Sequence, residues 1–120
     1  SFTEFDYSNL ILQDKLLNTD DSLKFSLSLK NTGKFTGKEV IQVYINDVVS
    51  SVTTPFKELK AFKKVELIPS ESQTIEFSIP INQLGLWNQH MEYVIEPGEF
   101  ELMIGSSSED IRLQSKFQVN

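Results

Sequence analysis

Hydrophobic and polar residues alternate with a period of two along most of this chain. Successive side chains of a β-strand point to opposite faces, so this alternation predicts strands with one face on a core and the other in water. Four segments show the pattern most clearly, at residues 23–29, 75–79, 100–104 and 111–119. Turn-forming residues separate the segments, at 31–33, 69–70, 96–98 and 105–108. Phe77 and Phe100 fall on the inward parity, and Glu76 and Glu101 on the outward one.

The stretch 40–45 is largely apolar at both parities, with Val40 and Tyr44 at even positions and three aliphatic residues at odd ones. This composition is typical of a central strand that is covered on both sides. Together with the alternating segments it predicts about seven or eight strands. We therefore expect an all-β protein, an antiparallel β-sandwich with the immunoglobulin-like plan.

Residues 56–65 carry an ambiguous pattern. Apolar residues recur there at every third position, which suits a helix, and Pro55 suits the first position of a helix. The apolar residues concerned are Phe56, Leu59, Phe62 and Val65. Local propensity alone leaves helix and strand both open for this segment.

Composition and charge narrow the possible functions. A chain of 120 residues is expected to form a single domain, residues 1–120. The absence of cysteine excludes disulfides and thiolate metal sites, and the single histidine excludes a site built from several imidazoles. The net charge of −6 makes nucleic acid and anionic membranes poor partners. We expect no cofactor and no metal.

Two features concern the setting of the chain. It does not begin with methionine, and its first residues already have the character of a strand, so we expect a module of a longer protein. The lack of cysteine fits the cytoplasm and leaves the periplasm open, so a cytoplasmic location is slightly favoured over a periplasmic or secreted one. No apolar run has the length of a membrane span, which takes roughly 18 residues.

Glu99 and Glu101 are the first candidates for catalysis. Two residues apart on a strand, they point the same way with Cα atoms about 6.6 Å apart. Glycosidases use two carboxylates roughly 5–9.5 Å apart. However, the alternating pattern already requires a polar face opposite Phe100 and Leu102, and nothing apolar nearby would raise one carboxyl pKa. We interpret both glutamates as residues of a solvated face.

Trp87, His90 and Tyr93 are candidate contact residues around a polar turn. Trp87 and Tyr93 could form a flat platform for a sugar ring, or a cross-strand pair that closes a hairpin. His90 has no recognisable nucleophile partner, so a surface position in the hairpin is the simpler interpretation.

The remaining charged groups have ordinary explanations. Asp20-Asp21 and Glu109-Asp110 lack the alternating oxygen-ligand pattern of a calcium loop, and we expect them to be turn residues. The basic cluster is better explained by lysines that protect a sheet edge against aggregation than by nucleic-acid binding. It consists of Lys57, Lys60, Lys63 and Lys64.

Four stretches together resemble the fibronectin type III-like domain that ends many enzymes of glycoside hydrolase family 3. They are residues 1–10; Asn31-Thr32-Gly33 with Gly37 and 39–44; 55–65 followed by Leu67, Pro69 and Glu71; and 96–101 followed by 105–107 and 110–111. Trp87-Asn88-Gln89 with Met91 and Tyr93 is similar to a turn of bacterial periplasmic-type β-glucosidases. Ala61, Ser70 and Thr54 depart from the family pattern, in local turn detail. The resemblance also favours strand for 56–65.

The resemblance implies a non-catalytic accessory domain from the C-terminal end of a β-glucosidase. The parent would hydrolyse terminal β-D-glucosides with retention, using an Asp nucleophile and a Glu acid/base that lie in upstream domains. No catalytic residue can therefore be assigned here. The implied partners are the catalytic domains of the same polypeptide and, as a further candidate, a second subunit.

Two other functions remain open at this point. One is an independent carbohydrate-binding module using Trp87 and Tyr93, and the other is an adhesion domain that binds a protein. Segment 46–54 and the turn at 87–93 are the parts we would expect to reach a substrate site.

Overall fold

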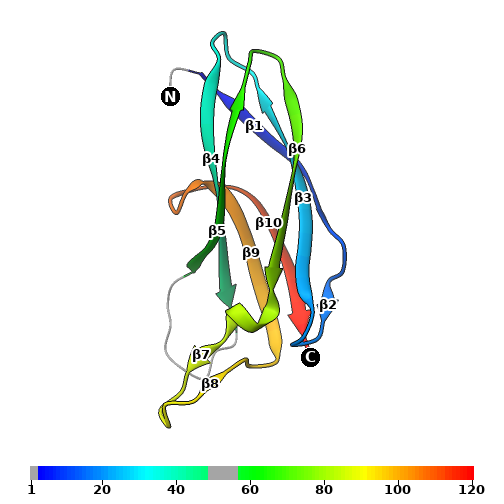
Figure 1. Cartoon of the computed structure of the whole chain (residues 1–120), viewed down its shortest axis with the longest axis vertical. Helices are drawn as coiled ribbons and strands as arrows, with labels where there is room; N and C mark the ends of the chain where they lie inside the picture. The colour runs from blue at the N-terminus through cyan, green and yellow to red at the C-terminus, as the bar shows by residue number, and fades with distance from the viewer. Residues whose placement is uncertain (1–2, 49–56) are drawn as a thin grey trace.

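The computed structural model describes residues 3–48 and 57–120, which form two facing β-sheets (Figure 1). The three-stranded sheet has the order β1-β3-β6, made of Phe5–Leu12, Ser22–Asn31 and Ser72–Pro80. The five-stranded sheet has the order β2-β10-β9-β4-β5, made of Leu16–Leu17, Asp110–Val119, Gly98–Ser107, Gly37–Asp47 and Glu58–Leu67.

A short 3-10 helix and a hairpin complete the fold. The helix η1 (Ile81–Leu84) follows β6 and leads into the hairpin of β7 (Leu86–Trp87) and β8 (Tyr93–Val94). The hairpin projects beyond one end of the sandwich, opposite the end at which β1 begins (Figure 1). No helix in the described ranges is long and apolar enough to cross a membrane.

The predicted all-β sandwich is confirmed, and the described residues place eight strands in its two sheets. One pairing departs from the antiparallel plan, because β2 runs parallel to β10 through Leu16–Gln118 and Leu17–Val119. After β1 the chain crosses from the edge of one sheet to the edge of the other, so β2 arrives beside β10 with the same direction. The crossing buries the Leu17 side chain at the rim of the core.

The core lies between the sheets and is built by the alternating residues. The inward residues of 23–29, 75–79 and 100–104 are all buried, as their parity predicts. Two aromatic pairs bridge directly opposite strand positions: Phe25 with Phe77, at 5.3 Å between ring centroids, and Phe100 with Phe117, at 5.4 Å. Each pair is nearly parallel, with 16° and 13° between the rings.

The ambiguous segment is a strand over its described part, because β5 pairs with β4 along its length. The register shifts between the pairs Val43–Ala61 and Tyr44–Leu59, so that Lys60 is an extra residue in β5. This bulge places Leu59 and Phe62 on the same outer face although they are an odd number of residues apart. The bulge thus accounts for the spacing of Leu59 and Phe62, whereas Val65 pairs with Glu39 and lies on the inner face. Phe56 lies outside the described residues.

The central position of β4, between β9 and β5, is also confirmed. Its inner residues, among them Ile41 and Val43, are fully buried. Its outer face is covered only in part: Tyr44 is buried, but Val40 is exposed. The expectation of cover on both sides was therefore too broad for the described chain.

Buried Asn31 joins both sheets at one end of the sandwich. Its Oδ1 accepts hydrogen bonds from the Thr3 hydroxyl at 2.8 Å and from the Gly33 N–H at 2.9 Å. Its Nδ2 donates to the carbonyls of Phe35 at 2.8 Å and Leu67 at 2.9 Å. Leu67 ends β5 and Asn31 ends β3, so one amide ties the two sheets together.

The predicted sheet edge lies at the lysine-rich strand, since β5 is the last strand of the five-stranded sheet. Lys63 donates to the Glu76 carbonyl of β6, and its ammonium lies 5.0 Å from the centroid of the Phe77 ring. Lys60 donates to the Gln83 carbonyl at 3.0 Å. These side chains bridge the open side of the sandwich and place charge along an edge where another strand could add.

The core predicts a clear contrast between neighbouring positions. Phe77→Ala and Phe100→Ala should each lower the free energy of unfolding by about 3–5 kcal/mol, because each removes a buried ring. Glu76→Ala, on the solvent face of the same strand as Phe77, should change it by no more than about 0.5 kcal/mol. Chemical denaturation followed by circular dichroism measures all three. A larger loss for Glu76→Ala than for Phe77→Ala would mean that the inward and outward faces are exchanged.

Candidate functional site

Trp87 and Tyr93 face each other across the β7–β8 hairpin, as directly paired residues. Their ring centroids are 5.5 Å apart and the ring planes make an angle of 63°. This edge-to-face arrangement is the cross-strand pair that the sequence left open as one of two possibilities. It does not present two coplanar rings, so the hairpin offers no flat two-ring platform.

The hairpin is fastened to the rest of the molecule through Tyr93. Its hydroxyl donates to the Asn82 carbonyl at 2.7 Å and accepts from the Gly85 N–H at 3.0 Å. A Cβ on Gly85 would lie 2.5 Å from the Tyr93 ring, so this close approach requires glycine. Tyr93 is therefore chiefly a structural residue of the hairpin base.

Asn88 organises the turn that carries His90. The Asn88 Oδ1 accepts from the backbone N–H groups of His90 at 2.8 Å and Glu92 at 3.0 Å, and its backbone carbonyl accepts from Met91 at 3.0 Å. The asparagine thereby satisfies the groups that the turn leaves unpaired, and Met91 adopts a left-handed conformation. His90 is exposed at the tip. The structure thus brings Trp87 and Tyr93 together, with His90 on the adjoining turn.

A second surface was only half visible in the sequence. Apolar side chains gather on the outer side of the five-stranded sheet, where Tyr44 pairs with Leu59 on one side and Met103 on the other. We call this surface the outer apolar face; it consists of Val40, Tyr44, Leu59, Phe62 and Met103. Tyr44 and Met103 are buried, whereas Phe62 is 65% exposed. Val40 and Tyr44 share this parity in the sequence, but Leu59 and Phe62 come onto one face with them only through the bulge in β5.

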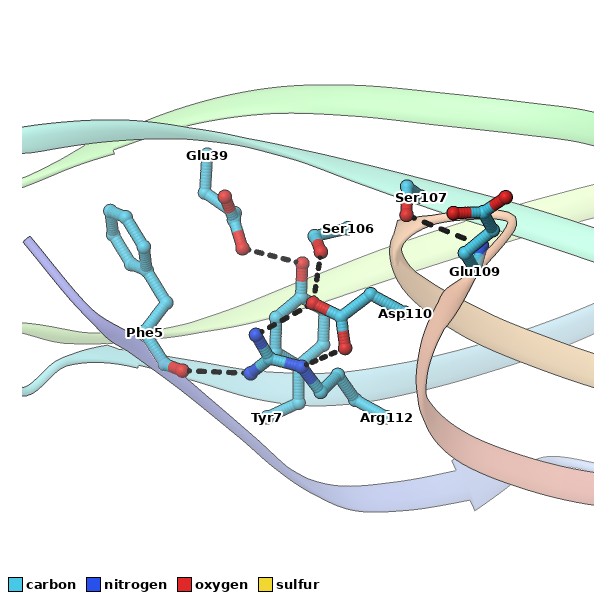
Figure 2. Close-up of polar contacts among 8 residues, drawn as sticks. All are labelled: Phe5, Tyr7, Glu39, Ser106, Ser107, Glu109, Asp110 and Arg112. Atoms are coloured by element: carbon cyan, nitrogen blue, oxygen red, sulfur yellow. Dashed lines mark hydrogen bonds and ion pairs between the residues drawn. The ribbon is translucent and has the colours of Figure 1, made fainter. Parts of the chain in front are cut away.

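A polar network connects β1 with β4 and with the turn that joins β9 to β10 (Figure 2). The Tyr7 hydroxyl donates to Glu39 Oε2 at 2.9 Å, which links β1 to β4. The Arg112 guanidinium lies 5.3 Å from the centroid of the Tyr7 ring and donates to the Phe5 carbonyl at 3.1 Å. Strands of both sheets are thereby joined.

Asp110 anchors the guanidinium of that network (Figure 2). Arg112 donates through Nε to Asp110 Oδ1 at 2.7 Å and through Nη2 to Oδ2 at 2.9 Å. Ser106 Oγ also donates to Oδ2, at 2.6 Å. The hydrogen bonds from Arg112 and then from Ser106 lower the pKa of Asp110 to about 2. Glu109-Asp110 is thus a turn whose aspartate has an intramolecular partner.

The other acidic candidates lie at ordinary surface positions. Glu99 is 3.9 Å from the Lys116 ammonium, and Glu101 is paired with Lys116 across the same strands. Asp21 accepts from the Asn18 N–H at 2.8 Å in the turn after β2. Among the described residues, no three His, Asp or Glu side chains converge where a metal ion could bind.

A sequence profile of the fibronectin type III-like domain matches residues 39–108. The chain belongs to the fibronectin type III-like domain family. It is 44% identical over 113 residues to β-glucosidase BoGH3A of Bacteroides ovatus, which covers 93% of this chain and 15% of the relative. It is 40% identical to thermostable β-glucosidase B of Acetivibrio thermocellus over 100% of this chain and 16% of that protein.

Solved structures agree with this assignment. The β-glucosidase from Listeria innocua in complex with glucose superposes on 99% of this domain with a TM-score of 0.92 and 39% sequence identity. The match covers 16% of that chain. The domain thus spans about a sixth of the length of the proteins it matches. The resemblance to the fibronectin type III-like domain of family 3 glycoside hydrolases is confirmed.

The polar network predicts a pH effect. Burial, and then the hydrogen bond to Glu39, raise the pKa of Tyr7 above its ordinary value near 10. Because the folded state keeps the Tyr7 proton while the unfolded state releases it, the stabilisation is complete below about pH 10 and is lost as the pH rises further. Tyr7→Phe should therefore make the alkaline decline of unfolding free energy shallower, measured by urea denaturation between pH 8 and 11. An unchanged slope in the variant would contradict the effect.

Proposed function

We propose that this domain is a non-catalytic accessory domain of a β-glucosidase, which packs against the catalytic domains of the same polypeptide and stabilises them. Its relatives are named β-glucosidases, and the domain accounts for about a sixth of their length. The parent would hydrolyse terminal β-D-glucosides with retention, using two carboxylates of its other domains. A second subunit is a further candidate partner.

The outer apolar face is the observation that carries this proposal. The outer side of the three-stranded sheet shows what a solvated sheet surface looks like here, because its β3 and β6 positions are polar: Lys24, Ser26, Ser28, Thr74, Glu76 and Ser78. The outer apolar face departs from that alternation at five positions on three neighbouring strands, including the exposed Phe62 and Leu59. Apolar side chains that gather in this way around one polar residue, Gln42, mark a contact surface.

Chemistry within the domain supports an accessory role. Glu99 and Glu101 lie on the same outer side of the sheet, where Lys116 accompanies both. A general acid requires a carboxyl group whose pKa is raised by an apolar, enclosed environment. An open sheet surface with a lysine beside the carboxylates provides the opposite environment.

Deleting residues 1–120 from the full-length parent should lower its melting temperature and solubility, and should change its kcat much less. Contacts between domains of one chain bury roughly 600–1,500 Å², and at ~25 cal/mol per Å² of apolar area they stabilise by several kcal/mol before ordering costs. Calorimetry and kcat on an aryl β-glucoside measure the two quantities. A truncated enzyme that melts as before but no longer turns over would show that the domain acts at the active site.

Two exposed phenylalanines allow a matched test of the docking surface. Phe62, in the outer apolar face, is 65% exposed, and Phe35, in the loop after β3, is 62% exposed. Phe62→Ser should destabilise the full-length protein by about 2 kcal/mol, because a ring buried against a neighbouring domain is lost. Phe35→Ser should leave its stability unchanged, and in the isolated domain both variants should melt alike. Equal effects of the two variants in the full-length protein would exclude the outer apolar face as the contact.

A further inference from the structure

We propose that the exposed face of the Trp87 indole is a stacking site for one glucopyranose ring of a β-linked gluco-oligosaccharide. The site lies on the β7–β8 hairpin and does not include the outer apolar face. The choice of sugar rests on the proposed function, whereas the existence of a stacking site rests on the geometry of the hairpin.

The hairpin holds Trp87 in a fixed position without burying it. Trp87 remains 66% exposed although Tyr93 packs against it edge to face. Tyr93 is itself held by its two hydrogen bonds, to the Asn82 carbonyl and from the Gly85 N–H. The mobility of the indole is thus restricted before any ligand arrives, which lowers the entropic cost of binding.

The turn beside Trp87 carries groups that suit sugar hydroxyls. Asn88 and Glu92 adjoin each other, with the Asn88 Nδ2 at 3.4 Å from Glu92 Oε1. Gln89 and His90 are exposed on the same five-residue connection. Amide, carboxylate and imidazole groups donate and accept the hydrogen bonds that hydroxyl groups require. Polar side chains thus lie on the turn that directly follows Trp87.

The size of the aromatic surface favours a sugar over a protein partner. All ring hydroxyls of β-glucopyranose are equatorial, so its two faces present C–H groups that can pack on an aromatic ring. Because the Trp87 and Tyr93 planes are inclined by 63°, they offer a surface for a single ring. A stable protein interface buries about 1,200–2,000 Å² in total and would have to extend well beyond this hairpin.

The test uses the fact that Trp87 is the only tryptophan of the chain, so that its fluorescence reports on this one side chain. The 120-residue chain is titrated with laminaritetraose, and with glycerol as a polyol control. We expect a saturable change in emission with a Kd of about 1–10 mM, the strength of one stacked ring with a few hydrogen bonds. A linear change, or the same change with glycerol, would overturn the proposal.

Calorimetric titration of variants supplies a second readout. Trp87→Ala should abolish the binding heat while the far-UV circular dichroism remains that of a folded sandwich, and Met91→Ala, a change of an exposed apolar residue in the same turn, should preserve it. Binding heat that survives Trp87→Ala would overturn the proposal. If the full-length Trp87→Ala protein instead melts earlier and sugar does not bind, the hairpin contacts protein.

These measurements involve no turnover. They therefore separate the two proposals: a parent without β-glucosidase activity would leave the binding result standing, and an active parent would not rescue a hairpin that fails to bind.

Discussion

The meeting of the two sheets at one end depends on the single buried amide of Asn31. Chain segments from both sheets and from the loop after β3 bring polar groups to the buried Asn31 side chain, and a buried polar group left unpaired would cost about 1–3 kcal/mol. Asn31 satisfies four of them at once, two as donor and two as acceptor. An aspartate at this position would have no hydrogen-bond donor, and a leucine of similar size would have neither a donor nor an acceptor, so neither residue could pair all four groups. Burial of the alternating apolar residues stabilises the packing of the two sheets. The Asn31 amide pairs the polar groups at one end of the sandwich, so that this packing leaves them hydrogen-bonded.

Much of the fold follows from local pattern. The period of two places Phe25, Phe77 and Phe100 inside because a strand has only two faces, and turn residues mark where strands end. The pattern at 56–65 was ambiguous for a physical reason: the bulge at Lys60 moves one apolar residue to the other face, and the bulge is determined by pairing with β4, which no local rule contains. The parallel entry of β2 beside β10 likewise depends on a crossing between sheets.

The candidate sites show the same limit. Trp87 and Tyr93 were recognisable because they flank a turn in the sequence, but the angle between their rings comes from the fastening of Tyr93 to η1. The polar network was not foreseen, since Arg112 reaches the Phe5 carbonyl across 107 residues of sequence. Contacts between residues so far apart in the chain produce no periodic pattern in the sequence. The outer apolar face lies between these cases: Val40, Tyr44 and Met103 follow from strand parity, whereas Leu59 and Phe62 share the face only because of the bulge.

The position of β10 affects how the domain can be made. This strand is the last of the domain, yet it lies inside the five-stranded sheet, between β2 and β9 (Figure 1). During synthesis β4, β5 and β9 therefore emerge before β10, when only one of the two neighbours of β9 is in place. The side chains of Phe100 and Leu17 lack their cross-strand partners until Phe117 and Val119 follow. A ribosome adds about 5–20 residues per second, so the nascent sheet exposes its edge for a second or so. The lysines of β5 lie at the opposite edge of the sheet, so the β9 edge has no such protection until β10 pairs with it.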